Sequence, residues 1–383
     1  MSICRIRYLI ILAIVLSSLL LTQCGSGHAV FCAGPCSSAS GATEFLYVTS
    51  TSHGGQILSF PVDHNSGTLG TSTAVSGPAS ASGIASAQNQ FIYVADNETG
   101  AIDAFVIDPN TGTLTVVPGS PFSDSSQTFP PQWLVAGPAV YTTAENGITG
   151  FTIASNGVLG EVVGSPYPGG FSGQAVLAQT NTTPVNTFLY ATNFLDPKGA
   201  ISVFQIVAPA SGILTPVPGD FTTGASTGPG AIVFAGTSPT SFIFVALNNS
   251  KQIATFLVDS STGALNPVPG SPLAVGFSPT SLALNAEQTF LYALNSSEGA
   301  ISVFRIASSG SLSPIGGSPF TVGQQPCCIA VTADNYLYVT LPESNEIQGF
   351  TISSANGGLA PLTTSPFPAL EPRLLTVVQT PAP

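Results

Sequence analysis

The chain has 383 residues, of which 44% are hydrophobic and only 6% are charged, and its formal net charge is −12. This balance argues against nucleic acid and anionic membrane surfaces as partners, because both are bound through basic patches. The 40 glycines and 32 prolines indicate a turn-rich chain, while 23 phenylalanines supply the apolar side chains that a folded core needs.

The N-terminal 23 residues are predicted to be a signal peptide. A basic start at Arg5 and Arg7 precedes an apolar run over residues 8–21, which is too short to cross a bilayer as a helix but typical of an export signal. The run ends in Leu21-Thr22-Gln23-Cys24-Gly25, which resembles the cleavage box of bacterial lipoproteins, although a small residue usually precedes the cysteine. We therefore expect an exported, cell-envelope protein that is lipid-anchored through Cys24; an ordinary signal peptide cut nearby, with release outside the cell, is the alternative.

Residues 24–44 form a Gly/Ser-rich stretch that we interpret as a tether. Export makes the cysteines candidates for disulfides, and Cys32 and Cys36 could close a small loop within this tether. Cys327 and Cys328 are adjacent, so in a strand they would point to opposite faces and would have separate roles. The pairing of these four cysteines stays open at this point.

From residue 45 to the C-terminus the chain repeats one unit seven times. Units begin at positions 45, 91, 139, 188, 242, 290 and 336, and the steps between them are 46 to 54 residues long. Three features recur in every copy: an aromatic residue at the third place of a FLYV-type run, a phenylalanine in the next segment, and a glycine followed two residues later by leucine. The aromatic residues are Tyr47, Tyr93, Tyr141, Tyr190, Phe244, Tyr292 and Tyr338; the phenylalanines are Phe60, Phe105, Phe151, Phe204, Phe256, Phe304 and Phe350.

Each unit reads as four short strands. The FLYV-type run is followed by an alternating segment such as residues 300–306, then by a strand such as Leu265 to Val268, and last by a small-residue strand such as residues 281–284. Four strands in a repeat of this length are typical of propeller blades, so we predict an all-β, seven-bladed β-propeller over residues 45–383. The first unit lacks its small-residue strand, and residues 373–379 are such a strand with nothing after it. The C-terminal strand should therefore complete the first blade and close the ring.

The repeat resembles the lactonase-type seven-bladed propellers, a group similar to bacterial 6-phosphogluconolactonase and to the YVTN-repeat surface proteins. The resemblance rests on runs such as Phe290-Leu291-Tyr292-Ala293-Leu294-Asn295 and Ala300-Ile301-Ser302-Val303-Phe304, followed by Gly-Ser-Pro. It implies the propeller fold and a lactone-hydrolysing activity. A phosphorylated substrate would need a cluster of basic residues, but only four basic residues follow the signal peptide.

Propellers usually bind ligands at one mouth of the central channel, on the loops between the first two strands and those leading into the small-residue strand. Polar candidates on these loops include Glu343 and Gln325, but Trp133, Glu371 and Arg373 stand out. Stacking on the only tryptophan, with charge-assisted hydrogen bonds from Arg373 and Glu371, could hold a polar or sugar-like ligand. Alternatively, Trp133 fills space between blades and Arg373 pairs with a nearby acid.

Metal and cofactor sites are not expected. The three histidines (His28, His53 and His64) all precede residue 65, and no Cys-x-x-C pair is present, so a zinc site is improbable. The sequence favours a monomeric binding module without catalysis, whose partner is a glycan, a small lactone or an envelope protein. A lactonase-type hydrolase that uses carboxylates of the mouth is the alternative.

Overall fold

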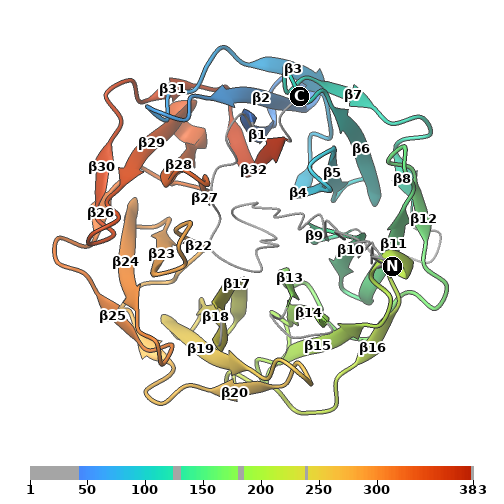
Figure 1. Cartoon of the computed structure of the whole chain (residues 1–383), viewed down its shortest axis with the longest axis vertical. Helices are drawn as coiled ribbons and strands as arrows, with labels where there is room; N and C mark the ends of the chain where they lie inside the picture. The colour runs from blue at the N-terminus through green and yellow to red at the C-terminus, as the bar shows by residue number, and fades with distance from the viewer. Residues whose placement is uncertain (1–42, 124–130, 180–184, 238–239, 381–383) are drawn as a thin grey trace, which may run out of the picture.

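The computed structural model describes residues 43–123, 131–179, 185–237 and 240–380. Over these residues the chain forms seven antiparallel sheets arranged around a central axis (Figure 1), which confirms the predicted seven-bladed propeller. Cys24, Cys32, Cys36 and the predicted signal peptide lie outside the described residues.

Four strands make up each blade, and the small-residue strand is the innermost (Figure 1). From blade 1 to blade 7 the inner strands are β32 (Pro372–Thr380), β4 (Ala81–Ala87), β9 (Trp133–Ala136), β13 (Ala175–Gln179), β17 (Pro229–Thr237), β22 (Ser281–Leu284) and β27 (Ile329–Val331). The second strands are β1 (Thr43–Ser50), β5 (Phe91–Asp96), β10 (Ala139–Ala144), β14 (Thr187–Thr192), β18 (Thr240–Leu247), β23 (Phe290–Asn295) and β28 (Tyr336–Leu341).

The third strands are β2 (Gln56–Val62), β6 (Ala101–Ile107), β11 (Gly147–Ile153), β15 (Ile201–Ile206), β19 (Gln252–Val258), β24 (Ala300–Ile306) and β29 (Glu346–Ile352). The outer strands are β3 (Thr73–Ser76), β7 (Leu114–Val116), β12 (Leu159–Glu161), β16 (Leu214–Pro216), β20 (Leu265–Pro267), β25 (Leu312–Pro314) and β30 (Leu359–Pro361). Four of the blades add a two-residue strand at the outer edge: β8 (Phe122–Ser123), β21 (Leu273–Ala274), β26 (Phe320–Thr321) and β31 (Phe367–Pro368). The only described helices are single 3-10 turns, η1 (Ser52–Gly54), η2 (Pro209–Ser211) and η3 (Pro342–Ser344), and none could span a membrane.

The ring closes as the sequence predicts. The C-terminal strand β32 pairs antiparallel with β1, in a register that places Gln379 opposite Glu44 and Leu375 opposite Val48. Blade 1 is therefore built from both ends of the propeller, and β32 covers the edge of β1 that would otherwise be unpaired.

One repeated contact joins neighbouring blades and explains two features of the repeat. The hydroxyl of Tyr292 in blade 6 donates to the carbonyl oxygen of the turn glycine Gly357 in blade 7, at 2.9 Å. A Cβ atom on Gly357 would lie 2.5 Å from the ring of Phe290, so the turn needs glycine both for its positive φ and for this close approach. Four other tyrosines make the same bond to the next blade: Tyr47 to Gly112, Tyr93 to Gly157, Tyr190 to Gly263 and Tyr338 to Gly67.

The repeated phenylalanines of the third strands are buried between blades. Phe256 of blade 5 is 4% exposed, and its core cluster includes Val176 and Tyr190 of blade 4. The ring of Phe256 thus packs between two neighbouring blades.

Four Gly-Ser-Pro segments and the Thr-Ser-Pro segment of blade 7 share a structural role that the sequence alone does not reveal. Each of five Ser-Pro serines accepts a hydrogen bond from a main-chain N–H in the middle of the third strand. In blade 6, the Ser318 hydroxyl accepts from Val303 N–H at 2.9 Å, between the part of β24 that pairs with β25 and the part that pairs with β26. The serine thus satisfies a donor that the split outer edge leaves unpaired. The other four serines are Ser120, Ser165, Ser271 and Ser365.

Candidate functional site

The end of the ring where the inner strands begin, here called the mouth, carries the polar loops. Inner strands run antiparallel to second strands, as in the pairing of Pro372 with Ser50. Loops that enter inner strands and loops that leave second strands therefore lie at the same end. The repeated glycine turns lie at the other end, here called the opposite end.

A pocket of about 590 Å³ opens at the mouth, over blades 6, 7 and 1. Its lining combines a guanidinium, a carboxylate, a thiol, an amide and two hydroxyls, and consists of Ser296, Ser297, Gln325, Cys327, Pro342, Glu343 and Arg373. We call it the Arg373 pocket.

Arg373 is held by its backbone, while its side chain is exposed. Its main-chain carbonyl accepts a hydrogen bond from the Thr340 hydroxyl at 2.7 Å, which joins the start of β32 to blade 7. Among the described residues, no carboxylate lies within ion-pair distance of the guanidinium. The expected alternative, in which Arg373 is neutralised by a nearby acid, is therefore not seen in this part of the chain, and the charge faces the pocket lining.

The Arg373 pocket does not contain the other two predicted site residues. Glu371 adopts a left-handed backbone with φ of 43°, and its carboxylate accepts a hydrogen bond from the Thr51 hydroxyl at 2.7 Å. Trp133 begins β9 in blade 3 and packs in a core cluster with residues of blades 3 and 4, such as Tyr141 and Leu177. Trp133 also lines a smaller pocket of about 290 Å³ at the mouth, over blades 3 to 6.

The two adjacent cysteines lie closer together than the sequence suggests. Their Sγ atoms are 3.1 Å apart, which corrects the expectation that they point to opposite faces. That expectation assumed a strand, but β27 begins only at Ile329, so the alternation of a strand does not apply to Cys327 and Cys328. Both are free thiols.

Cys327 is the member of the pair that lines the pocket. The hydrogen bond with the Cys328 thiol and, to a lesser degree, the positive charge of Arg373 lower the pKa of the Cys327 thiol in spite of its burial. The same hydrogen bond, together with burial, raises the pKa of Cys328. The sequence gives little indication that Cys327 is a site residue, because only its place just before an inner strand points to the mouth.

Comparison with known proteins identifies the fold family. The family model for "Lactonase, 7-bladed beta-propeller" matches residues 45–130, 136–276 and 269–364. The chain belongs to this lactonase family. No curated protein sequence matches it.

Solved structures with the same fold share little sequence with this lactonase-family chain. A candidate 6-phosphogluconolactonase from Bacteroides uniformis aligns with a TM-score of 0.73 and 20% identity, over 88% of this chain and 100% of that one. The periplasmic gluconolactonase of Pseudomonas aeruginosa aligns with a TM-score of 0.70 and 15% identity, again over 88% and 100% of the two chains. At such identities the similarity establishes the propeller alone.

Proposed function

We propose that the protein is a lactone hydrolase and that the reaction takes place in the Arg373 pocket. The observation that carries the proposal is that the guanidinium of Arg373, which has no ion-pair partner in the described part of the chain, shares a pocket with the carboxylate of Glu343. Membership of the lactonase family supports the reaction class. These findings favour the hydrolase over the binding module that the sequence alone suggested.

Two pocket residues, Glu343 and Arg373, have separate roles in the proposed reaction. Hydrolysis of a lactone needs a base that activates water and a donor that stabilises the oxyanion formed on the carbonyl oxygen. Glu343 takes a proton from water, whose oxygen adds to the carbonyl carbon, and the guanidinium of Arg373 donates hydrogen bonds to the oxyanion. When the oxyanion collapses, the ring C–O bond breaks and the leaving alkoxide takes the proton back from Glu343.

The charge of the pocket favours an uncharged substrate. Arg373 is the only cation among its lining residues, whereas a phosphate group usually needs several basic residues. The other arginine outside the predicted signal peptide, Arg305, lies elsewhere, over the ring of Phe290 at 4.7 Å. An uncharged sugar lactone is therefore the proposed substrate class, and the gluconolactone named for the Pseudomonas aeruginosa protein is its natural first test.

The proposal includes export. The predicted signal peptide and Cys24 would place the enzyme in the cell envelope, outside the cytoplasm, where a neutral sugar lactone is a more suitable substrate than a phosphorylated one. The periplasmic location named for the Pseudomonas aeruginosa gluconolactonase is consistent with this placement.

A panel of neutral and phosphorylated lactones tests the proposal. We expect turnover of neutral lactones. Arg373→Ala should lower kcat by about 10²–10³, the loss that follows removal of one oxyanion donor. Glu343→Gln should lower kcat by about 10²–10⁴, the usual contribution of a general base. Arg305→Ala is the matched control and should keep full activity. Cys327→Ser should also keep turnover, because the nucleophile is water rather than the thiolate.

A binding propeller without catalysis is the second candidate. The observation that favours it is that the pocket contains a single carboxylate rather than a convergent pair. No turnover above the uncatalysed rate, together with binding of a sugar or glycan that Arg373→Ala weakens, would replace the hydrolase by this function.

A further inference from the structure

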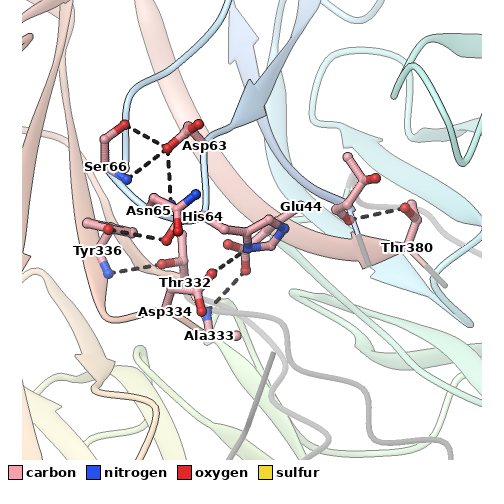
Figure 2. A network of polar contacts seen from close by, with 12 residues as sticks. Glu44, Asp63, His64, Asn65, Ser66, Thr332, Ala333, Asp334, Tyr336 and Thr380 are labelled. Atoms are coloured by element: carbon pink, nitrogen blue, oxygen red, sulfur yellow. Dashed lines mark hydrogen bonds and ion pairs between the residues drawn. The ribbon is translucent and has the colours of Figure 1, made fainter. Parts of the chain in front are cut away.

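Three side chains from separate parts of the chain, Glu44, His64 and Asp334, lie close together (Figure 2). They lie at the opposite end of the ring from the Arg373 pocket, because that is where second strands begin and third strands end. Glu44 is the second residue of β1, His64 lies in the turn after β2, and Asp334 lies in the turn between β27 and β28. One ligand atom of each lies within 4.8 Å of the others. Since the first two belong to blade 1 and the third to blade 7, the cluster bridges two blades.

Glu44 is the buried member of this cluster. Its side chain is 1% exposed, and its Oε1 accepts a hydrogen bond from Ala333 N–H at 3.1 Å. Its Oε2 is also buried but has no hydrogen-bond partner among the described residues. A buried carboxylate oxygen without a partner is costly, so the site is incomplete without a proton or a cation on this atom.

The other two ligands are held in place around Glu44. His64 Nδ1 contacts Asp334 Oδ2 directly, and the main-chain carbonyl of His64 accepts a hydrogen bond from the Tyr336 hydroxyl at 3.3 Å (Figure 2). Asp63, the remaining carboxylate nearby, is engaged in its own turn, where its Oδ1 accepts hydrogen bonds from Asn65 N–H and from the N–H and hydroxyl of Ser66. The turns of both blades thus present one nitrogen and two carboxylates toward a common point.

We propose that Glu44, His64 and Asp334 bind a divalent transition-metal ion of the zinc class. An imidazole nitrogen with two carboxylates is a ligand set that zinc uses, and three protein ligands leave a fourth position for water. Calcium and magnesium prefer oxygen ligands alone and fit less well. This site goes beyond the proposed lactonase function, because it lies at the other end of the ring from the pocket.

The ion would connect blade 1 to blade 7. The cluster sits beside the pairing of β32 with β1, where the two ends of the propeller meet. The unfolded chain cannot assemble these ligands, since His64 and Asp334 are 270 residues apart. Binding should therefore stabilise the folded ring in proportion to the free metal concentration.

Metal titration of the full chain, purified without an affinity tag and stripped with chelator, tests the proposal. We expect one Zn²⁺ per chain by calorimetry, and an unfolding equilibrium shifted about 100-fold toward the folded state at free zinc 100 times the dissociation constant. His64→Gln and Asp334→Asn should abolish this binding while their metal-free circular dichroism stays that of the parent protein. His53→Gln, which alters an exposed histidine at the mouth, should bind as the parent does.

The absorption spectrum of bound Co²⁺ distinguishes this site from the cysteine pair. Co²⁺ bound to nitrogen and oxygen gives only weak visible bands, whereas Co²⁺ bound to thiolate adds an intense near-ultraviolet charge-transfer band. Binding without that band, unchanged in Cys327→Ser, is the expected result. Failure to bind zinc stoichiometrically, or binding that survives in His64→Gln and disappears in Cys327→Ser, would overturn the proposal without touching the lactonase assay.

Discussion

The two ends of the ring are built in different ways. At the opposite end, blade after blade repeats one contact, in which a turn glycine sits against the aromatic residues of the preceding blade. At the mouth the loops differ: residues 145–146 connect β10 to β11, whereas residues 193–200 connect β14 to β15. The Arg373 pocket occurs over three blades only. The repeated contacts at the opposite end determine the fold, and the variable loops at the mouth carry the proposed catalytic residues.

The exceptions at the opposite end support this division. In blade 3 the first aromatic of the unit is replaced by Ala139, and the buried hydroxyl of Tyr141 has no hydrogen-bond partner among the described residues. In blade 5 the tyrosine is replaced by Phe244, which has no hydroxyl to donate. The ring still closes, so each inter-blade contact contributes a modest amount and the sum of them stabilises the fold. Substitutions at the repeated end should therefore change stability and leave any activity at the mouth unchanged.

Removing a repeated core ring should have the largest effect on stability. Phe256→Ala is expected to lower the free energy of unfolding by about 3–5 kcal/mol, because the cavity between blades 4 and 5 cannot collapse fully. Chemical denaturation measures this loss. An unchanged denaturation midpoint would refute the blade register assigned to this phenylalanine.

A matched pair of glycines separates backbone strain from close packing. Gly263 has φ of +77° and a Cβ there would lie 2.4 Å from the Phe188 ring, whereas Gly270 has φ of +83° with nothing within 4 Å. Gly263→Ala should cost about 2–5 kcal/mol, from left-handed strain plus overpacking, while Gly270→Ala should cost only the strain of about 1–2 kcal/mol. Equal losses in thermal and chemical denaturation would show that the inter-blade contact at Gly263 is not tight.

Metal-free protein should lose stability as the pH rises through neutrality. Burial raises the pKa of Glu44 from 4.5 to about 7, although the hydrogen bond from Ala333 N–H lowers it; the charges of Asp334 and His64 have smaller and opposing effects. The folded state therefore holds a proton that the unfolded state has released, so its contribution is complete below pH 4.5 and is lost as the pH rises through about 7.

The lost stability should amount to about 3 kcal/mol at most, and denaturation in chelator between pH 5 and 8 measures it. Glu44→Gln should flatten the profile. A parent profile as flat as that of the variant would show that Glu44 ionises freely in the folded protein.

The smallest expected effect concerns the tyrosine hydroxyls. Tyr292→Phe removes the hydrogen bond to Gly357 and should cost about 1 kcal/mol. Tyr141→Phe removes a buried hydroxyl that has no partner in the described chain, so it should be neutral or slightly stabilising. Equal losses in the free energy of unfolding, measured by urea denaturation, would contradict this expected difference.

The sequence predicted the fold well because each copy of the repeat corresponds to one blade. Seven copies of one pattern determined the number of blades, and the unmatched strand at each end predicted the pairing of β32 with β1. The sequence did not show that the glycines meet the preceding blade, because that contact joins positions about 65 residues apart, as in Tyr292 and Gly357.

The site was predictable only in part. Arg373 could be selected because basic residues are scarce, but the blade on which each loop lies decides which side chains share a pocket, so Trp133 lines a different one. The proposed metal site lacks any sequence motif, since its ligands come from three separate turns or strand ends. Counting histidines and spacings therefore predicted no zinc site, whereas the closed ring brings His64 beside two carboxylates.

Measuring turnover and stability on the same two variants tests the division between the ends most directly. Arg373→Ala should lower kcat/KM for a neutral sugar lactone by about 10²–10³ and leave the free energy of unfolding within about 0.5 kcal/mol of the parent. Tyr292→Phe should lower stability and leave kcat/KM unchanged. Equal losses of turnover in both variants, or no turnover by the parent protein, would contradict the assignment of chemistry to the mouth and folding to the repeated end.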